Sequence, residues 1–276
     1  MKSFNKVAII GTGLVGGSIA LALKKKGLAS LVVGVSRQKK NILLARRKGA
    51  IQAGSRVLSI IKGADLLILA TPVNTIIDLA PKIAKLTAGD CIVTDVGSTK
   101  GQIVSILEKL FPNYVGSHPL AGSQKRSMAN AHPDIFKDSL CILTPTRNTK
   151  KRALNKIRAL WKQLGAKVVL LAPATHDRIL SFVSHLPHAI AFSLMNTIEV
   201  SYLKFASTGL KDTSRIAASD SRLWVDIFLS NRKNMLRSID LFQDNLARIK
   251  SAVQKKDKRV LSSILKKAQL KRIRLT

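Results

Sequence analysis

A histidine and an arginine in this sequence could carry out acid–base chemistry on an anionic molecule. His118 stands before Pro119, which restricts the backbone, and an imidazole titrates near neutral pH. Such a histidine is a candidate general base, and a neighbouring serine could fix its tautomer. Arg215, in a second polar segment, could hold a carboxylate through two hydrogen bonds. The two side chains together predict a site for a small anionic substrate.

The same residues also have structural interpretations. His118 could be a buried histidine with satisfied hydrogen bonds, and Arg215 could pair with Asp212. His185 and His188 lie three residues apart, so a helix would place both on one face. Because no cysteine or histidine cluster has zinc-binding spacing, this pair predicts a polar seam and no metal site.

A glycine-rich turn near the N-terminus could hold a dinucleotide. Gly11, Gly13 and Gly16 fall in G-x-G-x-x-G spacing, after the apolar run 7–10 and around the start of a helix expected over 18–26. In this pattern the first glycine allows a sharp turn, the second leaves room for the pyrophosphate, and the third lets the helix pack closely. The helix N-terminus adds free N–H groups and a partial positive charge for the phosphates.

The residues after the second expected strand favour NADP over NAD. NAD sites of this type carry an acidic residue there for the ribose 2′-hydroxyl, whereas this chain has Ser36 and Arg37. A hydroxyl and a guanidinium suit a 2′-phosphate. NAD is the alternative cofactor. The structural interpretation is that these residues form a solvated basic loop that binds no cofactor. Leu14, Thr71 and Asp95, in the glycine loop or at strand ends, are the other expected cofactor contacts.

Alternating strands and helices must position these residues. Apolar runs predict buried strands, and amphipathic segments predict the helices between them. The expected strands are residues 7–10, 31–35, 64–70, 91–95, 114–117, 139–143 and 167–171, and the expected helices are 18–26, 41–48, 71–86 and 151–164. This order predicts an α/β fold, with an N-terminal Rossmann-like, doubly wound and mostly parallel sheet covered by helices on both faces. Ligands of such sheets bind beyond the carboxyl ends of the strands.

The pattern changes near Pro173. Strand signals end there, and helical spacing continues with dense apolar positions over 179–195 and a further repeat over 223–253. We therefore expect a dinucleotide-binding domain at 1–173 and a helical substrate and dimerisation domain at 174–276. Because apolar helix faces need partners, we expect a homodimer built through the helical domain.

Composition and charge narrow the class of protein. The chain has 276 residues, of which 46% are hydrophobic, so it is globular and long enough for two domains. The net charge of +32 has three interpretations: nucleic-acid binding, steering of anionic small molecules, or compositional drift. The basic residues are spread along the chain without aromatic interleaving, so we favour drift and steering and do not expect a nucleic-acid partner.

The cysteines and the apolar runs also bear on the cellular compartment of the protein. Cys91 and Cys141 fall in expected buried strands, which indicates core thiols in a reducing compartment. No apolar run reaches the roughly 18 residues that cross a bilayer, and the N-terminus has no secretory pattern. We therefore expect a cytoplasmic protein without a membrane partner.

Five motifs resemble those of the prephenate/arogenate dehydrogenase family of tyrosine biosynthesis. They are GTGLVGGS, TDVGSTKG, GSHPLAGSQ, SHLPH and GLKDTSRIAASD followed by LW, and they extend from the glycine loop to about Asn231. The family oxidises the ring of prephenate or arogenate while carbon dioxide leaves and a hydride passes to a nicotinamide. The resemblance thus implies an NAD(P)-dependent decarboxylating dehydrogenase.

The resemblance also implies a role for individual residues. His118 resembles the catalytic histidine that accepts the proton of the ring hydroxyl, and Ser98 resembles the serine that orients this histidine near the nicotinamide. Arg215 resembles the arginine that binds a substrate carboxylate. His188 and Lys211 resemble secondary polar contacts in the substrate pocket.

Two positions bear on the choice of substrate. Gln124 is neutral where several relatives carry an acid that would suit the ammonium group of arogenate, and His188 makes SHLPH more similar to the prephenate-using branch. We expect both residues, with His185, to contact the substrate. The sequence therefore favours prephenate oxidation to 4-hydroxyphenylpyruvate, with arogenate oxidation to tyrosine as the alternative. A β-hydroxyacid dehydrogenase and a basic Rossmann protein that binds nucleic acid are the remaining alternatives.

Overall fold

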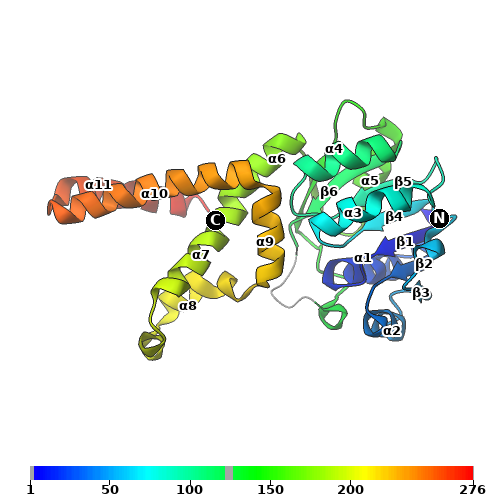
Figure 1. Ribbon diagram of the computed structural model, residues 1–276, viewed down its shortest axis with the longest axis horizontal. Helices are drawn as coiled ribbons and strands as arrows, with labels where there is room; N and C mark the ends of the chain where they lie inside the picture. The colour runs from blue at the N-terminus through cyan, green and yellow to red at the C-terminus, as the bar shows by residue number, and fades with distance from the viewer. Residues whose placement is uncertain (1–2, 122–126, 276) are drawn as a thin grey trace. The chain divides into compact units, whose positions relative to one another are not determined.

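Among residues 3–121 and 127–275, the part of the chain that this computed structural model describes, eight strands form one sheet (Figure 1). The strands are β1 (Phe4–Ile10), β2 (Ala29–Val35), β3 (Ala53–Ser55), β4 (Leu66–Leu69), β5 (Ile92–Asp95), β6 (Tyr114–Pro119), β7 (Leu140–Thr144) and β8 (Lys167–Leu170). Their order across the sheet is β3-β2-β1-β4-β5-β6-β7-β8. The strand order reverses direction beside β1, as in a doubly wound sheet.

The sheet is parallel from β3 to β6, and β7 then runs antiparallel to β6. His118 on β6 lies opposite Ile142 on β7, and β8 is parallel to β7. A parallel neighbour needs a crossover connection, usually a helix, whereas the described part of the β6–β7 connection contains only a short 3-10 turn, η2 (Met128–Asn130). The expected mostly parallel α/β sheet is confirmed, with this antiparallel pair as the exception.

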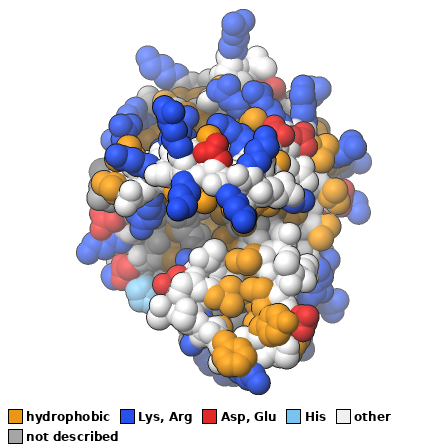
Figure 2. Space-filling view, turned by 90° about the vertical axis from the view of Figure 1, so that its left-hand side faces the viewer, with side chains coloured by type: hydrophobic (Ala, Val, Ile, Leu, Met, Phe, Trp, Pro, Cys, Tyr) orange, Lys and Arg blue, Asp and Glu red, His pale blue; other side chains and the backbone are white. Residues whose placement is uncertain are grey.

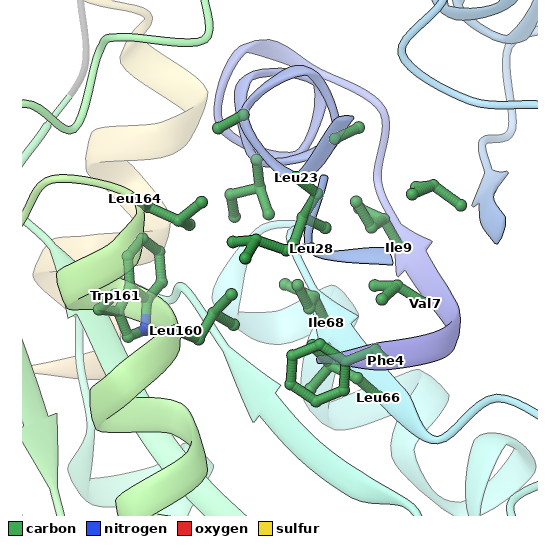
Figure 3. Packing of buried hydrophobic residues seen from close by; sticks show 14 of the residues in the cluster. Phe4, Val7, Ile9, Leu23, Leu28, Leu66, Ile68, Leu160, Trp161 and Leu164 are labelled. Atoms are coloured by element: carbon green, nitrogen blue, oxygen red, sulfur yellow. The ribbon is translucent and has the colours of Figure 1, made fainter. Parts of the chain in front are cut away.

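Helices cover both faces of the sheet, because alternate strand residues point to opposite sides. Val7 and Ile9 belong to one core cluster, and Ala8 and Ile10 belong to the other. The first cluster is covered by α1 (Leu14–Lys25), α2 (Lys39–Arg47) and α5 (Lys151–Gln163), and the second by α3 (Val73–Ala84) and α4 (Gly101–Leu110). Figure 3 shows the α5 side chains in the first cluster, among them the fully buried Trp161.

Three details differ from the sequence expectation, and one is that the short strand β3 was not expected. Helix α1 begins at Leu14, four residues before the expected start, so Gly16 lies in its first turn. A Cβ at Gly16 would lie 1.9 Å from the backbone oxygen of Gly11, so only glycine allows the helix to begin this close to the turn. Helix α4 was not expected, although its buried residues Ile103 and Leu107 show the four-residue spacing of a helix.

Helical segments follow β8. They are α6 (Pro173–Leu180), a π-helical turn η3 (Ser181–His185), α7 (Leu186–Thr197), the 3-10 segments η4 (Val200–Phe205) and η5 (Arg215–Ala218), α8 (Thr208–Ser214) and α9 (Ser221–Ser230). The run Pro173–Thr197 is long and apolar enough, by length and composition alone, to cross a membrane, although 22% of its most apolar window is buried in the protein. The expectation that apolar runs are too short therefore holds only for uninterrupted ones. This run also buries the polar side chains of His176, Asp177 and His185, as a helix of a globular core can do.

The described chain forms two compact units, 1–231 and 232–276. The second unit consists of α10 (Arg232–Gln254) and α11 (Lys258–Ile273), which contact each other. Strands end at Leu170 and helices continue from Pro173, as the composition suggests, but the first unit extends to Asn231. Hydrogen bonds such as Asn74 to Asp226 tie the later helices to the sheet domain. The division at 173/174 therefore stays a prediction.

Candidate active site

Three polar segments meet at the carboxyl edge of the sheet. The glycine loop follows β1, Ser98 follows β5, and His118 is the penultimate residue of β6. Among the described residues, two cavities open at this edge, of about 470 Å³ and about 320 Å³. Ser98 and His118 line both of them. A molecule in one cavity would therefore meet a molecule in the other beside these two side chains.

The smaller cavity, which we call the loop cavity, is bounded by the glycine loop. Gly13 and Leu14 line it, together with Thr71. Gly11 has a φ of +101°, and a Cβ there would lie 2.4 Å from the backbone oxygen of Ala70, so the turn requires glycine. Within the described ranges no side chain caps the N-terminus of α1, which leaves its first N–H groups for a ligand.

An unpaired hydroxyl supports a polar ligand in the loop cavity. Within the described residues, the buried hydroxyl oxygens of Thr12 and Thr71 have no hydrogen-bond partner, and Thr71 lines the cavity. A buried hydroxyl without a partner is unfavourable, so a bound hydrogen-bonding group would stabilise this arrangement. The glycine turn, the open helix N-terminus and these hydroxyls fit a dinucleotide.

The expected determinants of cofactor choice lie at the end of β2. Ser36 is half-buried and accepts a hydrogen bond from the N–H of Gln38, at 3.3 Å, while Arg37 is exposed. Neither residue lines the two cavities. Arg56 is also exposed and follows Ser55, the last residue of the neighbouring strand β3. Two guanidinium groups thus follow adjacent strand ends, a basic pair that the sequence analysis did not single out.

Asp95, which was expected to contact the cofactor, does not line the loop cavity. Its carboxylate is fully buried, accepts hydrogen bonds from the N–H of Gly97 at 2.8 Å and the hydroxyl of Tyr114 at 2.7 Å, and pairs with the ammonium of Lys100. Lys100 also donates to the carbonyl of Ser117, at 2.8 Å. Asp95 therefore shapes the turn after β5 and anchors β6 next to His118, and it does not line either cavity.

His118 is joined to a second histidine and a carboxylate. Its Nδ1 lies 2.8 Å from Nε2 of His176, and Nδ1 of His176 lies 2.8 Å from Oδ1 of Asp177. Asp177 also accepts the backbone N–H groups of Lys100, at 2.7 Å, and Gly101, at 2.8 Å. These side chains come from β6 and α6, and His176 and Asp177 are buried. We call His118, His176 and Asp177 the histidine chain.

The electrostatics of the histidine chain favour a neutral His118. Burial lowers the pKa of His118 well below its ordinary value, and the nearby His176 and Lys100 lower it further. Burial also lowers the pKa of His176, against the opposing effect of Asp177. Burial raises the pKa of Asp177, but its hydrogen bonds outweigh this and hold the pKa below its usual range. Two neutral imidazoles and a carboxylate are therefore the expected forms at neutral pH.

The larger cavity, which we call the helical cavity, carries a cationic group and an imidazole. Arg215 and His188 both line it. Burial lowers the pKa of His188 against the opposing effect of its hydrogen bond to Ser184, and the charge of Arg215 lowers it further. Nδ1 of His188 donates to the carbonyl of Ser184, at 2.9 Å, so its Nε2 remains for a ligand. His185 also lines this cavity, and burial lowers its pKa to about 4.

Apolar side chains form one wall of the helical cavity. His188 stacks on Trp224, with ring centroids 3.5 Å apart. Leu180, Ile216, Leu223 and Ile227 complete the apolar wall. A carbon ring fits such a wall, and a carboxylate on that ring fits the guanidinium of Arg215.

Sequence comparison identifies the family. The family model described as "Prephenate dehydrogenase, nucleotide-binding domain" matches residues 19–170, and that described as "Prephenate dehydrogenase, dimerization domain" matches residues 172–267. The chain belongs to the prephenate dehydrogenase family. This assignment makes the protein a dehydrogenase that uses a nicotinamide cofactor, and it sets aside the β-hydroxyacid dehydrogenase and non-enzyme alternatives.

Named relatives agree with this family. The prephenate dehydrogenase of Bacillus subtilis is 32% identical over 95% of this chain and 74% of its own length. The cyclohexadienyl dehydrogenase of Zymomonas mobilis is 32% identical over 100% of this chain and 97% of its own length. The crystal structure of the Aquifex aeolicus prephenate dehydrogenase with hydroxyphenyl propionate and NAD+ superposes with a TM-score of 0.94 and 33% identity, covering 99% of this chain and 98% of that one.

In this prephenate dehydrogenase family member, one expected substrate contact with a described position does not line the site. Lys211 lies exposed on α8 and is absent from the described lining of the helical cavity. Gln124 lies outside the described residues. Ser98 does line both cavities, but the described hydrogen-bond partner of His118 Nδ1 is His176.

The sequence analysis also missed residues of the site. His176 and Asp177 were not singled out, although an adjacent histidine and aspartate in the first helix after the last strand are a signal for a polar contact near the sheet edge. Trp224 was interpreted only as part of a motif, although a tryptophan on an amphipathic helix could have marked it as a cavity wall.

Proposed function

We propose that this enzyme oxidises and decarboxylates prephenate to 4-hydroxyphenylpyruvate with NADP as the hydride acceptor. The observation that carries the proposal is that the loop cavity and the helical cavity share His118 and Ser98. Hydride transfer needs the cofactor and the substrate in contact at one point, with a base beside them. The shared side chains provide that point.

The described residues account for each part of the reaction. Arg215 binds a carboxylate of the substrate, and the apolar wall that includes Trp224 holds the ring and excludes water. His118 accepts the proton of the ring hydroxyl as the carbon that bears it becomes a carbonyl. A bound nicotinamide would accept the hydride from that carbon. The bond to the ring carboxylate then breaks, its electrons make the ring aromatic, carbon dioxide leaves, and the phenolate oxygen takes the proton back from His118.

The charges of the helical cavity support prephenate over arogenate. Arg215 is cationic, and His188 presents a ring nitrogen. Asp220 also lines the cavity, but its carboxylate caps α9 by accepting the N–H groups of Arg222 at 2.9 Å and Leu223 at 3.3 Å. A carboxylate engaged in this way is a poor partner for the ammonium of arogenate, whereas a keto acid needs no such partner.

The choice of NADP rests on the basic strand ends. Ser36 N–H donates to the carbonyl of Ser55 at 3.2 Å, so Arg37 and Arg56 follow neighbouring positions at the edge where the ribose of a bound dinucleotide would lie. Two guanidinium groups favour a 2′-phosphate by charge-assisted hydrogen bonds. NAD, which lacks that phosphate, would gain nothing from either arginine.

A homodimer through the helical segments is part of the proposal. Exposed apolar side chains on η4 and α9 include Val200 at 83%, Phe205 at 76% and Leu229 at 63% exposure. Figure 2 shows hydrophobic side chains gathered on the lower part of one face, where Figure 1 places α7 and α8. Exposed apolar groups on this scale need a partner, and a second copy of the chain would supply it. Cytoplasmic location and the absence of a nucleic-acid partner stay predictions.

The test is steady-state reduction of NADP and of NAD, each with prephenate and with arogenate. We expect the highest kcat/KM with prephenate and NADP. Turnover with arogenate alone would overturn the substrate while retaining the roles of His118 and Arg215, and preference for NAD would overturn the cofactor choice. Absence of turnover in all four combinations would overturn the proposed reaction.

A further inference from the structure

The histidine chain contains two groups that touch neither cavity. His118 lines both cavities, whereas His176 is fully buried and Asp177 is 5% exposed, and neither of these lines a cavity. Burying a carboxylate and an imidazole is costly unless each is hydrogen-bonded. Both are, and the bonds run in one line from Asp177 through His176 to the base. An apolar pair at these two positions would pack α6 against the sheet without a desolvation penalty. The buried, hydrogen-bonded side chains of His176 and Asp177 therefore indicate a functional role.

The direction of each hydrogen bond follows from the anionic end. Asp177 already accepts two backbone N–H groups and, as a carboxylate, can only accept. Nδ1 of His176 must therefore donate to it, which leaves Nε2 of a neutral His176 as an acceptor. Nδ1 of His118 must then donate to His176, which leaves Nε2 of His118 with the lone pair. This is the tautomer that can remove a proton from a substrate.

We propose that His176 and Asp177 are positioning residues that hold His118 in its Nδ1-protonated tautomer and stabilise the imidazolium that forms on it. The inference rests on the proposed function, because it gives His118 the role of base. When His118 takes up the substrate proton on Nε2, its Nδ1–H strengthens the bond to His176, and the carboxylate of Asp177 offsets the new positive charge. The base would otherwise be an isolated buried imidazole beside the cationic Lys100.

The two backbone N–H groups at the start of α4 hold the carboxylate end of the histidine chain in place. Lys100 and Gly101 hold both oxygens of Asp177, so the carboxylate cannot turn away from His176. The ammonium of Lys100 meanwhile pairs with Asp95 and binds the carbonyl of Ser117, the residue before His118. The same short segment thus fixes both ends of the histidine chain, its carboxylate and the strand that carries its base.

The tautomer can be measured without turnover. We would label the histidines of the full chain with ¹⁵N and assign His118 by its loss in His118→Asn. At a pH where His118 is neutral, we expect a protonated Nδ1 and an unprotonated Nε2. A protonated Nε2 in the wild-type protein would overturn the inference. This readout is independent of the reaction, so a failed activity assay and a failed tautomer assignment are distinguishable.

Variants of His176 separate positioning from support of the fold. A glutamine can accept from His118 and donate to Asp177, so His176→Gln should keep the tautomer and remain within roughly tenfold of wild-type kcat. His176→Phe fills the space without hydrogen bonds and should lower kcat by roughly 10²–10⁴-fold, with little change in KM. Equal kcat values in wild type and His176→Phe would overturn the inference.

Asp177→Asn tests the charge. Without the carboxylate the imidazolium is less stabilised, so the acidic limb of the kcat–pH profile should move to lower pH while the plateau falls by roughly 10²–10⁴-fold. A purely structural role would lower the amount of folded enzyme and leave the profile in place, and that outcome would overturn the inference. The controls are Asp134→Asn, at a half-buried position, and His132→Gln, at an exposed one; both lie outside the two cavities and should leave kcat and the profile unchanged.

Discussion

The imidazole of His188 lies flat on the indole of Trp224, with ring centroids 3.5 Å apart and planes inclined by 23°. The contact joins α7 to α9 and builds one wall of the helical cavity. A flat pair of this kind presents an apolar face and a ring nitrogen to the same ligand. The stacked pair is therefore suited to contact a ring that carries polar groups.

Replacing Trp224 should weaken substrate binding more than chemistry. Aromatic pairs contribute about 0.5–1.5 kcal/mol beyond their buried area, so Trp224→Leu should raise KM for prephenate by at least roughly 2–10-fold while kcat changes less. Trp224→Phe retains an aromatic face, so its KM should lie between those of the wild type and Trp224→Leu. Steady-state kinetics at saturating cofactor test this. A Trp224→Leu enzyme with unchanged KM would show that the stacked pair does not contact the substrate.

Removing the base should abolish turnover but spare cofactor binding. His118→Asn should lower kcat by roughly 10²–10⁴-fold, because the substrate hydroxyl loses its proton acceptor. Binding of NADPH, followed by its fluorescence, should change by less than roughly tenfold, since the glycine loop is untouched. An Asn variant with full activity would contradict the role of His118.

Arg215 should act through its fork geometry. Arg215→Lys keeps the charge but loses the second hydrogen bond to a carboxylate, so KM for prephenate should rise by roughly tenfold or more. The matched control is Arg222→Lys on the exposed surface of α9, where no change is expected. Equal KM values for the two variants would place the substrate carboxylate elsewhere.

The basic strand ends should set the choice of cofactor. Hydrogen bonds to charged groups contribute about 1.5–3 kcal/mol, so Arg37→Asp should lower kcat/KM for NADP by roughly 10–100-fold and spare NAD. Arg56→Asp should act in the same direction. Arg47→Asp on α2 makes the same change of charge at another exposed position and serves as the control. A uniform effect of all three would indicate long-range charge rather than a 2′-phosphate contact.

The buried histidines should make the fold sensitive to acid. The pKa values of His118, His176, His185 and His188 are all lowered, to about 4 for His185. As the pH falls below about 6.5, the unfolded chain takes up protons that the folded chain refuses, so the free energy of unfolding must decrease. The decrease continues until the pH reaches the lowered folded values.

Denaturant unfolding between pH 7.5 and pH 4.5 measures this loss. A His185→Gln variant has one titrating group fewer and should lose less stability over the same interval. If wild type and His185→Gln showed the same slope against pH, proton uptake at His185 would not contribute.

The sequence by itself determined the parts that depend on local pattern. Apolar runs with intervening amphipathic segments specify buried strands and covering helices. The spacing of Gly11, Gly13 and Gly16 specifies a turn in which Gly11 and Gly16 leave no room for a Cβ. His118 and Arg215 could also be selected by residue type, because few side chains act as bases or carboxylate clamps. These features can be predicted from sequence because each depends on residues only a few positions apart along the chain.

Tertiary structure decided which of these groups meet. His118 and His176 are 58 residues apart in sequence and come from different elements, so no local spacing reveals their hydrogen bond. Packing likewise turned Asp95 inward onto Lys100 and left Lys211 exposed on α8, although both occur in motifs that look functional. Contacts between distant segments depend on how helices lie on the sheet, and that is settled only when the whole core packs.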